Sequence, residues 1–343
     1  MKKDILNLIN CPSCEKDKFE LDIKQKNSLE IREGVLKCKN CNSKFFIHKG
    51  ILDLLYKPSA TIQKEREAMT EIVIKKERPE KICNDQWLLS LPFPKTMGTN
   101  KKILKMMIDV GKNFTNFLEW IKFNGNEKVL DLGAGNCWST NYVSKKLSKG
   151  YCVALDISDI KYSELESADV YIKHNKIFFE RVLSNMDKLP FKSDIFDIVF
   201  VNNAVHHASS LQNTCYEISR VLKRGGRLIL TNEPVISSIK RINKKTYEIL
   251  NEDREKGFNE NIYTLKDYIK SLKRANLKPK IYLRQDIMEE KVNRILGRSV
   301  FFKPIQVIWG SIAQNLKKVL FKSIYRELSF FLAVRTNIIA YKI

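Results

Sequence analysis

The chain has 343 residues, a hydrophobic content of 43% and a formal net charge of +22. The length gives room for about two domains, and the apolar content suits a packed core. No apolar run is long enough for a signal peptide or for the roughly 18 residues of a spanning helix. We therefore expect a cytoplasmic protein whose eight cysteines are thiols or metal ligands rather than disulfides. The charge is compatible with nucleic acid, an anionic membrane or a compositional bias.

Two pairs of cysteines stand near the beginning of the sequence. Cys11 and Cys14 frame CPSC, Cys38 and Cys41 frame CKNC, and 23 residues separate the pairs. Each pair can form a tight knuckle, and two knuckles together give a tetrahedral set of four thiolates that suits Zn²⁺. FELDI and SLEIREGVLKC predict short strands between the pairs. A ribbon this small would draw folding energy from the metal, so the pattern predicts a closed, structural zinc site.

The same segment resembles a known family. CPSC, LKCKNCNSKFFIHKGILDLL and their spacing over residues 9–56 are similar to the zinc-ribbon family of the activator subunit of tRNA and protein methyltransferases. In bacteria that domain is often fused ahead of a methyltransferase. The resemblance implies that residues 1–56 form a docking or stabilising domain rather than a catalytic one.

Residues 57–122 predict a connector and helices that cover the entrance of the next domain. TIQKEREAMTEIVIKKE is compatible with a helix, whereas the prolines of DQWLLSLPFPKTMGTN favour a loop packed on a surface. Residues 102–122 place apolar residues at helical spacing, with one break expected at Gly111.

A glycine loop opens the next segment. KVLDLGAG predicts a strand that ends in Asp131 and is followed by Gly133 and Gly135. WSTNYVSKKL predicts a helix, and YCVALDIS a second strand ending in Asp156, 21 residues after Gly135. Such glycines let the backbone approach a ligand, and the acid can hold two ribose hydroxyls. Cys137 occupies the place where dinucleotide-binding loops need a third glycine beside a pyrophosphate, which disfavours a nicotinamide cofactor.

Three further segments continue this pattern in order. They are KIFFERVLS, NMDKLPFKSDIFDIVFVNNAVHH and ISRVLKRGGRLILTNEP. With the glycine loop they resemble the type 11 group of class I S-adenosylmethionine-dependent methyltransferases over residues 127–234. The resemblance implies a doubly wound, Rossmann-like α/β fold, with a seven-stranded sheet in a domain of residues 123–290 and S-adenosyl-L-methionine as cofactor.

The resemblance also assigns cofactor contacts. Gly133 and Gly135 would lie under the methionine and ribose, Asp131 near the amino group and Asp156 at the ribose hydroxyls. Four more positions would complete the site: Ile157 beside the adenine, Asn185 where the family often has an acid, Met186 against the ring and Asn202 near the methionine. The Asn185 carbonyl could accept a hydrogen bond from the adenine amino group.

The acceptor side of the site is less specific. His206 and His207 follow the fourth strand, where a neutral imidazole could deprotonate an acceptor hydroxyl, although packing against the next helix is the alternative. The loop 254–263 is a second candidate for acceptor contact, through Asn259, Glu260, Asn261 and Tyr263.

Residues 291–343 form a basic segment with ten Lys or Arg and one acid, Glu327. Residues 307–328 are amphipathic as a helix, with Lys318, Lys322 and Arg326 away from the apolar face. Such a helix can lie on an anionic membrane surface as a peripheral contact, or pack on its own domain. The final FFLAVRTNIIAYKI predicts a closing edge strand.

Three functions are compatible with this organisation. The leading hypothesis is methyl transfer from S-adenosyl-L-methionine to a small-molecule, sugar or lipid-linked acceptor. The first alternative is an RNA base methyltransferase, because the positive charge suits phosphates. The second is a non-enzymatic cofactor-binding protein that recruits partners through the ribbon, which an intact Gly133, Gly135 and Asp156 disfavour.

Overall fold

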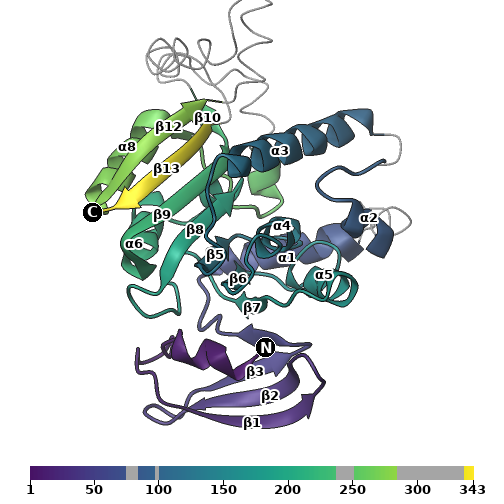
Figure 1. Ribbon diagram of the computed structural model, residues 1–343, viewed down its shortest axis with the longest axis vertical. Coiled ribbons are helices and arrows are strands. Elements are labelled where there is room, and N and C mark those ends of the chain that lie inside the picture. Colours follow the sequence, from purple (N-terminus) through teal and green to yellow (C-terminus); the bar gives the residue numbers. More distant parts are fainter. Residues whose placement is uncertain (75–83, 97–99, 237–250, 284–335) are drawn as a thin grey trace, which may run out of the picture.

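The computed structural model describes residues 1–74, 84–96, 100–236, 251–283 and 336–343 (Figure 1). The first unit is a small antiparallel sheet preceded by a 3₁₀ helix, η1 (Lys3–Asn7). Its strands are β1 (Phe19–Lys26), β2 (Ile31–Cys38), β3 (Lys44–His48) and β4 (Ile51–Asp53). The two strands predicted between the cysteine pairs are therefore confirmed.

The second unit is a seven-stranded sheet in the order β7-β6-β5-β8-β9-β13-β12. Its strands are β5 (Lys128–Leu132), β6 (Tyr151–Asp156), β7 (Glu180–Leu183), β8 (Phe196–Asn202), β9 (Leu222–Glu233), β12 (Leu277–Leu283) and β13 (Thr336–Lys342). The strands from β7 to β9 are parallel, and β13 is antiparallel to both of its neighbours. The predicted doubly wound sheet is confirmed.

Helices cover both faces of this sheet, as the alternation of buried side chains along its strands requires. Leu130 and Leu132 of β5 share one core with helices α6 (Leu211–Val221) and α8 (Leu265–Arg274). Val129 belongs to the core on the other face. There the helices are α2 (Asp85–Ser90), α3 (Lys101–Glu119), α4 (Trp138–Ser144) and α5 (Ala168–Asn175).

Three local expectations were wrong. Residues 85–90 form a helix rather than a loop, because Asn84 caps it by accepting a hydrogen bond from the Trp87 amide. Helix α3 runs unbroken through Gly111, where an added Cβ would lie 2.6 Å from the Pro92 carbonyl oxygen, so the glycine serves a close approach rather than a break. Strand β13 is not an edge strand, since it lies between β9 and β12.

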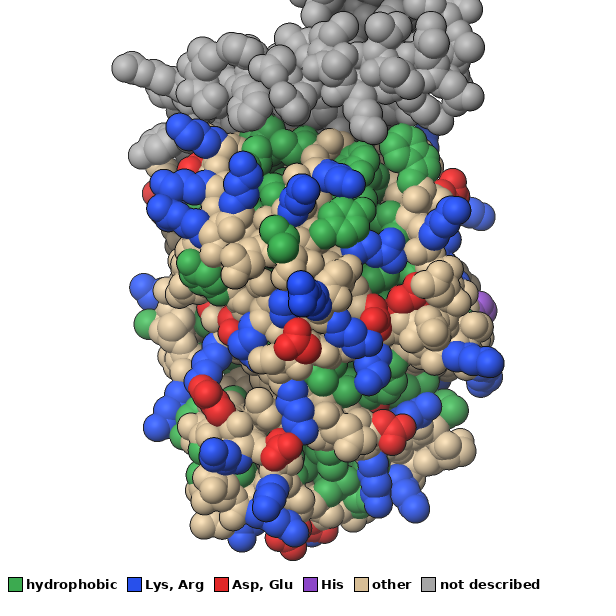
Figure 2. All heavy atoms as spheres, turned by 60° about the vertical axis from the view of Figure 1, so that its left-hand side comes forward, with side chains coloured by type: hydrophobic (Ala, Val, Ile, Leu, Met, Phe, Trp, Pro, Cys, Tyr) green, Lys and Arg blue, Asp and Glu red, His purple; other side chains and the backbone are tan. Residues whose placement is uncertain are grey.

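The surface carries its positive charge in dispersed form over the face that Figure 2 brings forward. Lys and Arg side chains are scattered across this side of the molecule, and Asp and Glu side chains lie among them. None of the helices in the described part of the chain is both long and apolar enough to cross a bilayer. The amphipathic segment 307–328 lies outside the described residues.

The two units share one continuous sheet, which the sequence did not predict. Strand β4 pairs in parallel with β7, with Leu52 opposite Val182 and Asp53 opposite Leu183. This pairing joins the ribbon to the seven-stranded sheet, giving eleven strands in total. The ribbon thereby covers the β7 edge of the seven-stranded sheet. It is part of the main sheet and not a separate appendage.

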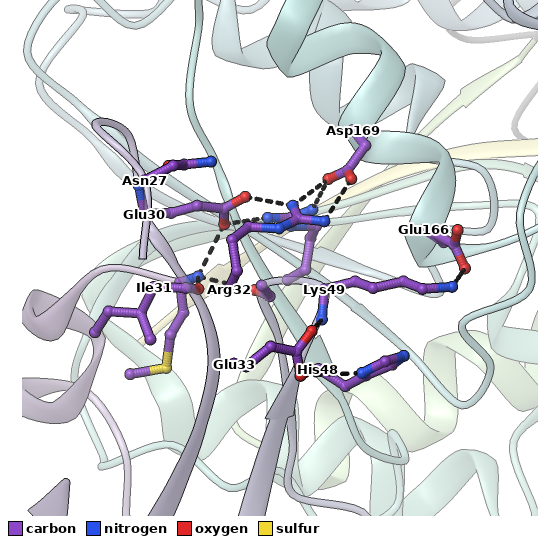
Figure 3. Close-up of polar contacts among 12 residues, drawn as sticks. Asn27, Glu30, Ile31, Arg32, Glu33, His48, Lys49, Glu166 and Asp169 are labelled. Atoms are coloured by element: carbon purple, nitrogen blue, oxygen red, sulfur yellow. Dashed lines mark hydrogen bonds and ion pairs between the residues drawn. The ribbon is translucent and has the colours of Figure 1, made fainter. Parts of the chain in front are cut away.

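Ion pairs reinforce this junction (Figure 3). Arg181 of β7 is fully buried and pairs with both Glu30 of the ribbon and Asp169 of α5. Arg32 of the ribbon reaches the same Asp169 at 2.8 Å, and its other terminal nitrogen lies 2.7 Å from Glu30. Each of these four side chains therefore faces at least one opposite charge, as a buried network requires.

Candidate active site

A pocket opens at the carboxyl ends of the parallel strands, the usual position for a ligand in this kind of sheet. Helix α1 (Ala60–Ile74) covers it through Ile62, Glu65 and Met69, as expected for the connector. The remaining lining residues come from the turns after the strands: Gly133, Gly135, Leu155, Asp156, Ile157, Glu164, Ser184, Asn185, Met186, Asp187, Asn203, Ala204, His207, Ala208 and Ser209.

The glycine loop forms one wall because its backbone turns back on β6. The amides of Gly133 and Ala134 both donate to the Leu155 carbonyl oxygen. Gly133 has a φ of +75°, and a Cβ added there would lie 2.4 Å from the Ala204 side chain. Gly135 also has a positive φ, of +50°, but the nearest atom to a Cβ added there would be the Ser163 carbonyl oxygen at 3.9 Å, an ordinary contact distance. Glycine is therefore favoured at position 133 by both the close contact and the positive φ, and at position 135 by the positive φ.

Cys137 is the residue before α4, and it is fully buried. Its φ is +63°, in the left-handed region that favours glycine. Backbone conformation therefore explains why glycine suits this position, because the buried thiol is accommodated while the positive φ remains.

Asp156 closes β6 and presents its carboxylate to the pocket. Oδ2 accepts a hydrogen bond of 2.8 Å from the Gly135 amide, and Oδ1 one of 2.7 Å from the Ile157 amide. Burial raises the pKa of this carboxyl above its usual range, and the two amides oppose that shift. Because a carboxylate has about four acceptor positions, it retains capacity for ligand hydroxyls.

Asp131 lies behind the glycine loop, and it is not among the residues that line the pocket. It is fully buried, and its Oδ2 accepts hydrogen bonds from the hydroxyls of Ser139 and Thr140 in α4. Oδ1 has no hydrogen-bond partner among the residues that the structure describes. Burial raises the pKa of Asp131 to about 7.

The other predicted contacts divide into two groups. Ile157, Asn185 and Met186 line the pocket, but the Asn185 Oδ1 already accepts hydrogen bonds from the amides of Asp187 and Lys188. The predicted role of that carbonyl as an acceptor for adenine therefore conflicts with the geometry, because both of its lone pairs are engaged.

Asn202 is also outside the pocket lining. Its Oδ1 accepts hydrogen bonds from Thr231 and Asn232, so the side chain ties β8 to β9. The neighbouring Asn203 lines the pocket instead.

The charge of the pocket wall was not predicted. Its described lining residues include four carboxylates, those of Glu65, Asp156, Glu164 and Asp187, and neither Lys nor Arg. The pocket wall is therefore locally acidic, whereas the whole chain carries an excess of positive charge. A wall of this kind favours a cationic ligand and opposes a pyrophosphate.

The histidine pair sits at the rim of the pocket within a group of carboxylates. His206 is buried, with its Nδ1 3.0 Å from Glu233 Oε2. His207 lines the pocket, with its Nδ1 3.2 Å from Glu65 Oε1. Each Nε2 lies 3.6 Å from an oxygen of Glu260. Burial opposes the charged form of His207, but the surrounding carboxylates outweigh it and raise its pKa.

The loop 254–263 reaches this rim, but it does not enter the pocket lining. The side chain of Asn259 donates to the His207 carbonyl oxygen, and that of Asn261 to those of His206 and Ala208. These two predicted acceptor contacts therefore hold the histidine turn in place. Tyr263 lies in the short strand β11 (Tyr263–Thr264) with its ring against that of Tyr268.

The four ribbon cysteines converge as predicted. The Sγ atoms of Cys11 and Cys41 are 3.6 Å apart, as are those of Cys14 and Cys38, and all four lie within 4.8 Å of one another. Four sulfurs around one tetrahedral zinc, with Zn–S bonds of about 2.3 Å, would be about 3.8 Å apart. The residues present therefore fit a Zn²⁺ ion.

Comparison with known proteins assigns both units. Residues 130–230 match the Methyltransferase domain family, and residues 2–50 match the Trm112p-like protein family. The chain contains a class I methyltransferase domain behind a Trm112p-like domain. Both resemblances drawn from the sequence are confirmed.

Two relatives illustrate the extent of the similarity. A malonyl-[acyl-carrier protein] O-methyltransferase of Legionella pneumophila is 28% identical over 147 residues, which is 42% of this chain and 49% of that protein. The ubiquinone/menaquinone biosynthesis C-methyltransferase UbiE of Wigglesworthia glossinidia brevipalpis is 32% identical over 124 residues, 35% of this chain and 48% of that protein. The chain thus spans about half the length of the curated relatives it matches.

A solved structure extends the likeness in fold. Geranyl diphosphate C-methyltransferase of Streptomyces coelicolor A3(2), with Mg²⁺, geranyl diphosphate and S-adenosyl-L-homocysteine, matches with a TM-score of 0.51 at 15% identity. The match covers 84% of this chain and 99% of that chain.

Proposed function

We propose that the chain binds S-adenosyl-L-methionine in the acidic pocket and transfers its methyl group to a small-molecule acceptor. The observation that carries this proposal is the set of four carboxylates without Lys or Arg among the described lining residues. S-adenosyl-L-methionine carries a sulfonium and an ammonium cation, whereas a nicotinamide dinucleotide carries a pyrophosphate. The wall suits the former, and the methyltransferase relatives agree.

The cofactor would supply a methyl group on a sulfonium, ready for in-line displacement by an acceptor. The chain's own residues would orient the cofactor and remove water from around it. Asp156 accepts hydrogen bonds from ribose hydroxyls, and Gly133 and Gly135 leave room for the ligand against the backbone. The walls formed by Leu155 and Met186 exclude water and press on apolar parts of the ligand.

Asp131 and the adenine pocket complete the proposed cofactor site. The buried Oδ1 of Asp131 offers a negative charge behind the glycine loop, where an ammonium group reached through water would be stabilised. Ile157 provides an apolar contact for the adenine. With the Asn185 oxygen engaged by the turn, the carboxylate of Asp187 is the nearby acidic group that lines the pocket.

The acceptor would enter at the rim, where His207 and the residues Ala208 and Ser209 line the pocket. His207 would contact the acceptor, while His206 would position the turn through its bond to Glu233. The names of the relatives, which act on malonyl-[acyl-carrier protein] and in ubiquinone/menaquinone biosynthesis, favour a small or carrier-linked acceptor. Among the described residues on the face in Figure 2, basic side chains are interspersed with acidic ones.

We further propose that the four ribbon cysteines hold one structural Zn²⁺ per chain, because their sulfurs have the separation that a tetrahedral site needs. Metal analysis of protein purified without chelator should find at least one zinc. Cys38→Ser should lower the zinc content by one ion per chain, while the exposed change Asp22→Asn should leave it unchanged. Zinc that stays bound in Cys38→Ser would refute the assignment.

Calorimetry tests the cofactor directly. S-adenosyl-L-methionine should bind with one site per chain, and NAD⁺ should not bind under the same conditions. Equal binding of both ligands, or of neither, would refute the proposal. Mass spectrometry of metabolite and RNA pools with and without the protein would then identify the acceptor through species that differ by one methyl group.

A further inference from the structure

Three side chains at the pocket rim converge on one point. One ring nitrogen of His206, one of His207 and a carboxylate oxygen of Glu260 all lie within 4.8 Å of one another. Each oxygen of Glu260 faces one histidine: Oε2 lies 3.6 Å from His206 Nε2, and Oε1 lies 3.6 Å from His207 Nε2. The histidines come from the turn after β8, and the glutamate comes from the separate loop 254–263.

The far nitrogen of each imidazole faces its own carboxylate. His206 Nδ1 lies 3.0 Å from Glu233, and His207 Nδ1 lies 3.2 Å from Glu65. A neutral imidazole that carries its proton on Nδ1 beside a carboxylate has its lone pair on Nε2. The His206 Nδ1 contact has hydrogen-bond geometry, whereas the His207 Nδ1 contact with Glu65 is an ion-pair distance only. In this tautomer both Nε2 lone pairs are available for a ligand beside Glu260. This pairing of a carboxylate behind each histidine is the arrangement that orients histidine ligands on metal ions.

The distances between each Nε2 and Glu260 can be compared with those of a hydrogen bond and those between two ligands of one metal ion. A protonated imidazole beside a carboxylate would form a charge-assisted hydrogen bond of about 2.7–2.9 Å. Both Nε2–oxygen distances are 3.6 Å, which is too long for such a bond. Two ligands at about 2.1 Å from one ion in tetrahedral geometry are about 3.4 Å apart. The observed separations are close to this value.

The charge balance points the same way. Three carboxylates, those of Glu65, Glu233 and Glu260, surround two imidazoles, and their side chains are only 4%, 1% and 20% exposed. These carboxylates place up to three negative charges in a poorly solvated region, which favours a cation beside them. A divalent ion would offset two of the three charges.

We propose that His206, His207 and Glu260 form a binding site for a divalent transition-metal ion, with Glu233 and Glu65 holding the two imidazoles in orientation. Two imidazoles and one carboxylate suit Zn²⁺, Fe²⁺ or Co²⁺ and leave further coordination positions open. The proposed site adjoins the pocket through His207, which also lines it. The binding of metal here does not depend on methyl transfer.

Cobalt titration of the full-length, zinc-loaded protein tests the site. Co²⁺ bound by imidazole and carboxylate gives visible absorption without the intense near-ultraviolet band of cobalt thiolates, so exchange into the cysteine site is distinguishable. We expect one Co²⁺ per chain with the nitrogen–oxygen spectrum. Glu260→Gln should weaken its binding by about 10-fold or more. The exposed Glu255→Gln, five residues earlier, is the matched control and should bind Co²⁺ like the original chain.

Two results would overturn the proposal. One is a protein that takes up Co²⁺ only with thiolate absorption, which would leave the cluster as a network of hydrogen-bonded side chains. The other is an affinity in Glu260→Gln equal to that of the original chain. His207→Gln provides a second variant if the loop of Glu260→Gln is disturbed, and circular dichroism verifies that each variant is folded.

Discussion

Replacement of Asp156 by asparagine tests the proposed cofactor site most directly. The carboxylate accepts hydrogen bonds from the amides of Gly135 and Ile157, one on each oxygen, and would accept further bonds from the ribose. Asparagine has only one oxygen, so its amide group must face one of these backbone donors or a ligand hydroxyl. The negative charge, which contributes to attraction of a cationic ligand, is lost as well.

The magnitude follows from the number of bonds to a charged acceptor. Loss of hydrogen bonds to an ionised group costs about 1.5–3 kcal/mol, which corresponds to about 10- to 150-fold in the dissociation constant. Calorimetry with S-adenosyl-L-methionine should show this weakening in Asp156→Asn. Asp22→Asn, at an exposed ion pair of the ribbon, should leave the affinity unchanged. An unchanged affinity in Asp156→Asn, with the protein folded, would show that the ligand binds elsewhere.

The remaining predictions concern stability. Gly133→Ala should lower the free energy of unfolding by about 1–3 kcal/mol more than Gly135→Ala in denaturant titrations, because its Cβ would lie 2.4 Å from Ala204, whereas a Cβ at position 135 would lie 3.9 Å from the nearest atom; equal losses would contradict the steric argument. Burial raises the pKa of Asp131 to about 7, so the folded state binds the proton more tightly than the unfolded chain. This contribution is complete at low pH and is lost as the pH rises from about 4 to 7. The stability of the original chain relative to Asp131→Asn should therefore fall between about pH 4 and 7 in thermal unfolding and level off above that range, and a constant difference would refute the shift. Arg181→Met removes one cation from Glu30 and Asp169, which both keep Arg32 as a partner, and should cost about 1.5–3 kcal/mol through the lost charged hydrogen bonds; a loss below 1 kcal/mol in denaturant titrations would show that the junction contributes little.

The sequence predicted features that are local along the chain. The glycine loop, the acid at the end of β6 and the paired cysteines each depend on a few neighbouring residues, and all lie where their motifs place them. Spacing identifies the end of a strand, and parallel strands bring such ends to one edge of the sheet. This is why Gly133, Gly135 and Asp156 meet at the pocket.

Features that depend on which other segment of the chain a segment packs against were not predictable in this way. Asn202 and Asn203 are adjacent at the end of β8, and alternation alone decides which of them faces the pocket. Glu65 reaches the pocket from a helix that precedes the glycine loop by about 70 residues, and no motif joins the two. Strand β13 looks like an edge strand by composition, because the sequence does not show that β12 pairs with its outer side.

The pairing of β4 with β7 links the ribbon to the pocket through a short path. The Leu54 amide donates to the Leu183 carbonyl oxygen at the end of β7, and the next residue, Ser184, lines the pocket and donates its amide to the Asp156 carbonyl oxygen. The ribbon therefore supports the strand whose end carries the pocket wall. A metal that stabilises the ribbon also stabilises this strand, since an exposed β7 edge would lose its paired backbone groups. The ribbon is consequently part of the scaffold of the proposed cofactor site, although none of its cysteines lines the pocket.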